Sequence, residues 1–140
     1  YDSAVPTLEH VLGHAWGEKI TMHHEVERYI HALADASPRV QLEEHGKTWE
    51  GKKLYHLVIA SESNMQRLDE IKAGLKQLSD PRKISAAEAT QLIDNLPAVT
   101  WLAYGVHGNE ISSTDAGLMT AYHLVASIGD SLSENVLKNM

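Results

Sequence analysis

The part of the chain best suited to chemistry is the segment from Tyr104 to Glu110, which reads YGVHGNE. His107 and Glu110 stand three residues apart, where a strand is predicted to end and a helix to begin. Imidazole nitrogens and carboxylate oxygens are usual zinc ligands, and a catalytic zinc takes three protein ligands and a water. His107 and Glu110 are therefore candidates for two zinc ligands, and the sequence does not reveal a third.

The neighbours of this pair suit a metal-binding turn. Gly108 has no side chain, so the chain can turn sharply there and let a substrate approach. Glu110 is expected in the first turn of the following helix, where the positive end of the helix dipole keeps a carboxylate ionised, as a metal ligand must be. The His-x-x-Glu pattern is short, however. It is also compatible with a hydrogen-bonded loop His107 and a helix-starting Glu110.

Helices and strands alternate before this segment. Apolar residues spaced i, i+3, i+4 and i+7 predict a helix over residues 21–36. Alternation over residues 40–45 and an apolar run over 54–60 predict an antiparallel hairpin, with the second strand buried on both faces. The apolar stripe of the helix consists of Val26, Tyr29, Ile30 and Leu33.

The second half of the chain is predicted to be mainly helical. Capping boxes at Ser63 with Gln66 and at Ser85 with Glu88 predict two helices, ending near the prolines at positions 81 and 97. A strand is expected over residues 98–106, a helix over 111–127 and a short helix over 133–140. The side chains expected to face inward are Met65, Leu68, Ile71, Leu75 and Leu78 in the first helix, Ala89, Leu92, Ile93 and Leu96 in the second, and Ile111, Leu118, Tyr122 and Val125 in the third.

This order predicts an α/β fold in which helices flank a mixed sheet. At 140 residues the chain has the length of one ordinary domain, and it contains no internal repeats. Its net charge of −7 and the absence of a basic run argue against nucleic acid as the main partner. The absence of cysteine excludes thiolate zinc ligands and disulfides, and no apolar run approaches the roughly 20 residues of a membrane-spanning helix.

Two segments carry a resemblance to a known family. Residues 99–110, VTWLAYGVHGNE, followed by the small residues 112–114, resemble the first zinc-binding segment of zinc metallocarboxypeptidases. Residues 45–54, HGKTWEGKKL, are similar to the family's first hairpin with its G-x-[ST]-x-E-G-[RK] turn. The resemblance covers roughly residues 20–128. It implies a partial zinc-carboxypeptidase-like fold, with an N-terminal arm at 1–20 and the N-terminal portion of a truncated catalytic domain at 21–140.

The resemblance also implies an activity. His107 and Glu110 would be the first two ligands of one zinc ion, and the family's third ligand, general base and carboxylate-binding residues would follow downstream. His123 lies in the predicted helix and is not assigned as the third ligand. No catalytic residue is therefore expected within this chain. We predict that the parent enzyme hydrolyses C-terminal peptide bonds with zinc-activated water, whereas the isolated chain is inactive and binds zinc weakly or not at all.

Asn109 marks a departure from part of the family. Digestive members carry an arginine directly before the zinc-binding glutamate, whereas Asn109 offers a hydrogen bond without charge, so we assign it to substrate binding. The His-Gly-Asn-Glu form also occurs in deacylases of N-acyl amino acids, the desuccinylase and aspartoacylase group. The hairpin and the helical insert at 63–96 favour a peptidase. A non-catalytic binding domain with the same fold is the third reading.

The other histidines do not predict a second metal site. His24 and His31 are seven residues apart, too far along a helix to share an ion, and they are interpreted with His23 as solvated. His10 and His14 have the i, i+4 spacing of ligands on a helix, but the glycine at position 13 weakens a helix there. Both are expected at the surface.

Ser112, Ser113 and Asp115 raise the question of a nucleophile. No G-x-S-x-G elbow surrounds them. We interpret them as helix-start residues that satisfy free backbone donors.

The expected partners are the C-termini of peptide or protein substrates. The apolar strand at 98–106 would be left uncovered in a chain of this length, so self-association is also expected. The segment Pro6–Gly13 resembles the start of mature bacterial secreted members, and the chain begins without methionine. We therefore expect a secreted or periplasmic protein, either processed or trimmed.

Overall fold

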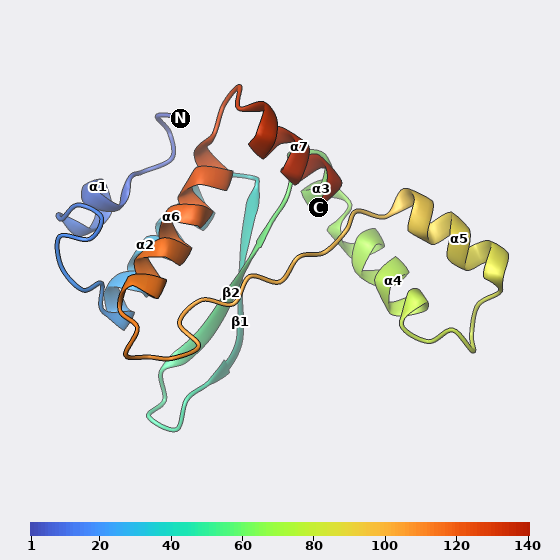
Figure 1. Cartoon of the computed structure of the whole chain (residues 1–140), viewed down its shortest axis with the longest axis horizontal. Coiled ribbons are helices and arrows are strands. Elements are labelled where there is room, and N and C mark those ends of the chain that lie inside the picture. Colours follow the sequence, from blue (N-terminus) through green and yellow to red (C-terminus); the bar gives the residue numbers. More distant parts are fainter.

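The computed structural model describes all 140 residues and has seven helices around one antiparallel hairpin (Figure 1). The predicted α/β class is confirmed, with a sheet of two strands. In chain order the elements are α1 (Leu8–Leu12), α2 (His23–Ala36), β1 (Val40–Lys47), β2 (Lys53–Ile59), α3 (Glu62–Gln66), α4 (Leu68–Leu78), α5 (Ala86–Asn95), α6 (Ser112–Ala126) and α7 (Ser131–Asn139).

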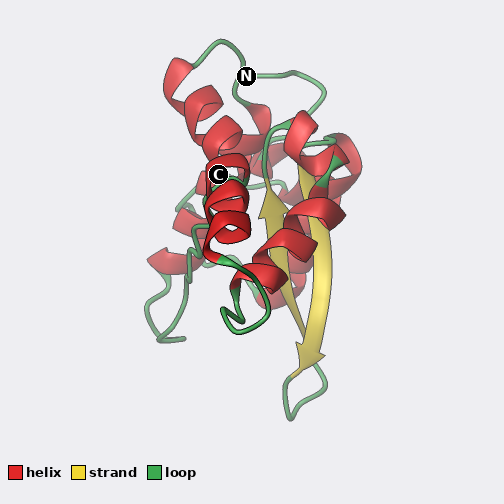
Figure 2. Cartoon of the chain, turned by 90° about the vertical axis from the view of Figure 1, so that its right-hand side faces the viewer, coloured by secondary structure: helices red, strands yellow, loops and turns green.

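The hairpin is amphipathic. Strands β1 and β2 pair with Val40 opposite Ile59, and the register shifts between Glu44 and Gly46. One face packs on the core, and the other is more polar, with Glu43 accepting a hydrogen bond from Lys72 of α4. The turn of the hairpin projects beyond the helices (Figure 2). The core-facing residues are Val40, Leu42, Tyr55, Leu57 and Ile59.

The predicted hairpin is confirmed, but the prediction that its second strand is buried on both faces is wrong. Leu54 is exposed and the following residues of β2 are only half-buried. The apolar run from 54 to 60 does not indicate how many layers cover it. Here, packing with the main core takes place on one face only.

Helices α2 and α6 form the main core. They contact each other, while α2 also contacts β1 and α6 contacts β2. Tyr29 and Leu33 of the predicted stripe have no exposed surface, and Leu118 and Val125 of α6 are buried beside them. The ten buried residues of this cluster are Val5, Leu8, Tyr29, Ile30, Leu33, Val40, Leu118, Ala121, Val125 and Ala126.

The N-terminal arm, residues 1–20, contributes to that core. Val5 and Leu8 are buried in it, and the Thr7 hydroxyl caps α1 by accepting the His10 N–H at 3.2 Å. His14 is buried as well, so the expectation of a surface histidine is wrong. Its Nε2 lies 3.9 Å from Glu25 Oε1. The spacing of His14 from its neighbours along the chain carries no sign of this tertiary contact.

Glu25 links the arm to α2. Its Oε1 lies 2.8 Å from Lys19 Nζ, and its Oε2 accepts the Met22 N–H at 2.9 Å. The Lys19 ammonium, followed by the Met22 N–H, lowers the pKa of the Glu25 carboxyl from 4.5 to about 2. The ionised form of Glu25 therefore stabilises the folded chain.

The Glu25 contribution to stability should depend on pH in a defined direction. Because the folded pKa is lower than the unfolded one, the stabilisation is fully present above about pH 4.5 and disappears as the pH falls towards 2. Urea unfolding of the unaltered chain and of Glu25→Gln should differ most near neutral pH and converge in acid. Glu62→Gln, at an exposed position of α3, is the matched control. A difference that is independent of pH would contradict this assignment.

Some helix details differ from the predictions. Ser61, not Ser63, begins α3, because its hydroxyl accepts the Asn64 N–H, and the helix is interrupted at Arg67. The capping box of Ser85 with Glu88 is confirmed. Ile93 is exposed rather than inward, since α5 packs on Gly74 of α4 through the leucines at 92 and 96.

The predicted strand over residues 98–106 is not formed. The Ala98 N–H donates to the Asn139 carbonyl, and this is the segment's sole backbone–backbone hydrogen bond. The segment crosses the hairpin instead of pairing with it, and the rings of Trp101 and His56 lie 6.0 Å apart (Figure 1). A strand requires a neighbouring strand to pair with, and no strand of the structure lies alongside residues 98–106. Its exposed apolar side chains are Val99, Trp101, Leu102, Tyr104 and Val106.

None of the helices combines the length and apolar character needed to cross a bilayer.

Candidate metal centre

His107 and Glu110 lie in an exposed turn that leads into α6. The Glu110 N–H donates to the His107 carbonyl at 3.0 Å, and the Ser113 N–H donates to the Glu110 carbonyl at 3.1 Å. These bonds wind the chain into the helix that begins at Ser112. Both candidate ligands therefore belong to one short turn, and Glu110 precedes the positive end of the α6 dipole.

The residues before the turn are fastened to α6. The Gly105 N–H donates to Ser113 Oγ at 2.7 Å, and the Tyr104 hydroxyl donates to Thr120 Oγ1 at 3.1 Å. The Tyr104 ring also lies on Gly117, where an added Cβ would stand 3.0 Å from Tyr104 Cγ. Gly105 has a φ of +69°, a conformation that favours glycine. Contacts with α6 thus fix the residues on the N-terminal side of the turn.

The donor types fit part of a zinc site. Imidazole and carboxylate are both usual zinc ligands. No group of three or more His, Asp or Glu side chains lies together in a metal-binding arrangement. His123 is engaged elsewhere on α6, with Nδ1 2.8 Å from the Tyr1 hydroxyl and Nε2 3.1 Å from Ser133 Oγ. His107 and Glu110 are therefore suited to be two ligands of a larger set.

Asn109 stands between the two candidate ligands and is exposed. Its amide is thus open to solvent beside the candidate metal position. It can donate and accept hydrogen bonds without adding charge there.

Two of the residues interpreted as helix starters have partners outside the helix. Ser113 accepts the nearby Gly105 N–H, as described above. Asp115 accepts the Gly17 N–H at 3.2 Å through Oδ2 and the Thr21 hydroxyl at 2.5 Å through Oδ1. No signal in the sequence predicts the Asp115 contacts, because they join residues more than 90 positions apart.

The histidines on α2 have other surroundings. His23 Nδ1 lies 3.7 Å from Glu27 Oε2, and His23 Nε2 lies 3.2 Å from the Lys53 carbonyl oxygen. His31 packs edge-on against Tyr55, with the ring centroids 5.6 Å apart. These positions do not assemble a second metal site.

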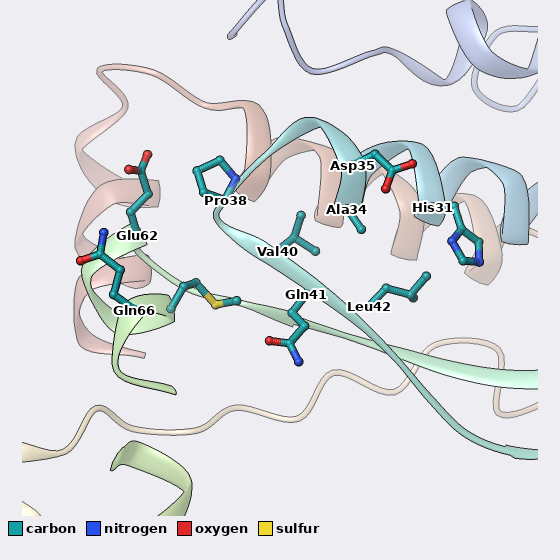
Figure 3. Close-up of a pocket in the computed structure, with 10 residues that line it drawn as sticks. His31, Ala34, Asp35, Pro38, Val40, Gln41, Leu42, Glu62 and Gln66 are labelled. Atoms are coloured by element: carbon teal, nitrogen blue, oxygen red, sulfur yellow. The ribbon is translucent and has the colours of Figure 1, made fainter. Parts of the chain in front are cut away.

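A surface cavity of about 580 Å³ lies between α2, β1 and α3 (Figure 3). His31 and Asp35 line it from α2, Gln41 from β1 and Glu62 from α3. None of its lining residues belongs to the segment 104–110, so the cavity is separate from the candidate metal centre.

Comparison with known proteins identifies one match. A family model described as zinc carboxypeptidase matches residues 26–140, which include the hairpin and the His107–Glu110 turn. Most of the N-terminal arm precedes the matched region. No curated protein and no solved structure matches the chain.

Proposed function

Because the chain belongs to the zinc carboxypeptidase family, we propose that it is the N-terminal portion of the catalytic domain of a zinc-dependent peptidase. The parent enzyme would release residues from the C-termini of peptides or proteins. The observation that carries this proposal is the exposed turn before α6 that contains His107 and Glu110, inside the region that the family matches. A secreted or periplasmic location is part of the same proposal.

The residues of this turn take distinct roles. His107 and Glu110 would hold two coordination positions of one zinc ion. Asn109 would donate a hydrogen bond to the substrate. When bound, zinc supplies Lewis acidity toward the scissile carbonyl and lowers the pKa of a bound water. The third ligand and the general base are expected downstream, so this chain alone would be inactive and bind zinc weakly or not at all.

Two other functions share the same turn. A deacylase of N-acyl amino acids could carry the same His-Gly-Asn-Glu sequence, and a non-catalytic binding domain could keep the fold without turnover. The β1–β2 hairpin and the inserted helices α3 to α5 support the peptidase.

The test compares substrates. A protein comprising this chain and the remainder of its catalytic domain is offered a blocked dipeptide and an N-acyl amino acid. We expect hydrolysis of the dipeptide, loss of activity after chelation and recovery with zinc. Preference for the acyl amino acid would favour the deacylase, and inactivity on both would favour the binding domain. For the 140-residue chain alone, nanomolar zinc affinity with dipeptide turnover would contradict its predicted inactivity.

Self-association through the segment 98–106 is a separate expectation. Trp101 is 73% exposed, and the backbone N–H groups of residues 99–104 make no hydrogen bond within the chain. A second copy offers the same segment, so the two can pair as strands. Sedimentation at about 0.15 M salt, which screens the net charge, should show concentration-dependent dimers. Trp101→Ser should weaken them, whereas Ile93→Ser on exposed α5 should not; a monomer at high concentration would contradict the expectation.

A further inference from the structure

We propose that the N-terminal arm positions the metal-binding turn, and that Asp115 is the positioning residue through which it does so. This inference rests on the proposed function, because it takes His107 and Glu110 as metal ligands. It adds a role for residues 17–21, which precede the part of the chain that the family matches.

Asp115 joins the arm to the start of α6. It lies in the first turn of the helix, five residues after Glu110. Its two carboxylate oxygens accept from Gly17 in the arm, through the N–H at 3.2 Å, and from Thr21 directly after the arm, through the hydroxyl at 2.5 Å. Hydrogen bonds to an ionised acceptor are stronger than neutral ones. Thr21 is 6% exposed, so its hydroxyl has little access to water as an alternative partner.

The arm end of this contact is itself held in place. Lys19 is paired with Glu25 of α2 at 2.8 Å, and Glu25 accepts the Met22 N–H. Further back, Val5 and Leu8 are buried in the core. Residues 17–21 therefore lie between two anchored parts of the molecule and can restrain whatever they bind.

The helix end of this contact is joined to the turn. Ile111 precedes α6 and provides no side-chain cap, so the turn is not fixed by a capping residue of its own. Ser113 instead accepts the Gly105 N–H, on the other side of the two candidate ligands. The arm thus restrains the start of α6 through Asp115. The start of α6 in turn restrains the chain on both sides of His107 and Glu110, through Ser113 on Gly105 before them and through Ile111 directly after them.

The test uses the 140-residue chain with two readouts. The first is hydrogen exchange, without metal, at the amides of Gly105, Glu110 and Ser113, which all have acceptors. The second is the dissociation constant for zinc ions alone. Thr21→Val should speed exchange at these amides and weaken zinc binding by about tenfold each, the scale of a lost hydrogen bond to a charged group. Asp115→Asn should act in the same direction.

Two variants serve as controls. Thr21→Ser keeps the hydroxyl and should retain both properties. Thr90→Val makes the same substitution on α5, at a hydroxyl that bonds only to a carbonyl of its own helix. It should change neither property.

The outcomes separate a local role from a general one. Equal acceleration at the hairpin amides would show that Thr21 supports overall stability and would overturn the inference, as would unchanged exchange at the three amides. Accelerated exchange there, in a chain that binds no measurable zinc even when unaltered, would support the arm's hold on the turn. The metal assignment is tested separately, by the zinc content of Glu110→Ala and His107→Ala in a protein that carries the remainder of the catalytic domain.

Discussion

Replacing Glu110 with alanine, in a protein that carries the remainder of the catalytic domain, should lower kcat/KM for a blocked dipeptide by more than about 100-fold. Mutation of even the outer-shell partners of metal ligands typically lowers metal affinity or activity by roughly 10–100-fold, so removal of a ligand should lower them more. His107→Ala should have a similar effect. Zinc content per protein, measured on the same samples, should fall together with activity.

The control for this pair is a neighbour that is not a ligand. Val106 is 75% exposed and directly precedes His107, so Val106→Ala should preserve both zinc content and kcat/KM. Full activity and zinc content in Glu110→Ala would remove Glu110 from the proposed ligand set. Loss of activity with zinc retained would instead assign Glu110 to the chemistry.

Replacing Leu33 with alanine should cost about 2–5 kcal/mol of the free energy of unfolding. Leu33 has no exposed surface and lies in the cluster where α2, α6 and the arm meet. Domains of this size are typically stable by only about 5–15 kcal/mol, so the change would remove a large part of the total. The urea midpoint should therefore fall strongly.

Leu132→Ala provides the matched control for Leu33. Leu132 is also helical, in α7, but is 69% exposed, so its truncation should change stability by less than about 0.5 kcal/mol. Equal shifts for the two variants would mean that the cluster around Leu33 is not the main core.

Local patterns were sufficient to predict the elements with their own periodicity. The stripe containing Tyr29 and Leu33 predicted α2 and its buried face, and the capping box at Ser85 predicted the start of α5. Competing signals gave the error at α3, where Ser61 and Ser63 both precede an apolar stretch and only the hydrogen bond to Asn64 distinguishes them.

Features that depend on distant parts of the chain escaped prediction. The composition of residues 98–106 favours a strand, but forming one requires an aligned neighbour that the segment does not have. Burial of His14 results from the folding of the arm against α2. For the candidate centre, sequence identified His107, Asn109 and Glu110, whereas the restraint on Asp115 comes from residues with no local relation to it.

The contact between Thr21 and Asp115 also has a consequence for the order of folding. Its partners are 94 residues apart, whereas the two strands of the hairpin are neighbours in sequence. Closing so large a loop costs more conformational entropy than closing the hairpin, and non-local contacts are slow to form. We therefore expect the hairpin to form early and the arm to dock only after α6 has left the ribosome. The turn with His107 and Glu110 would then reach its final shape after the hairpin during synthesis.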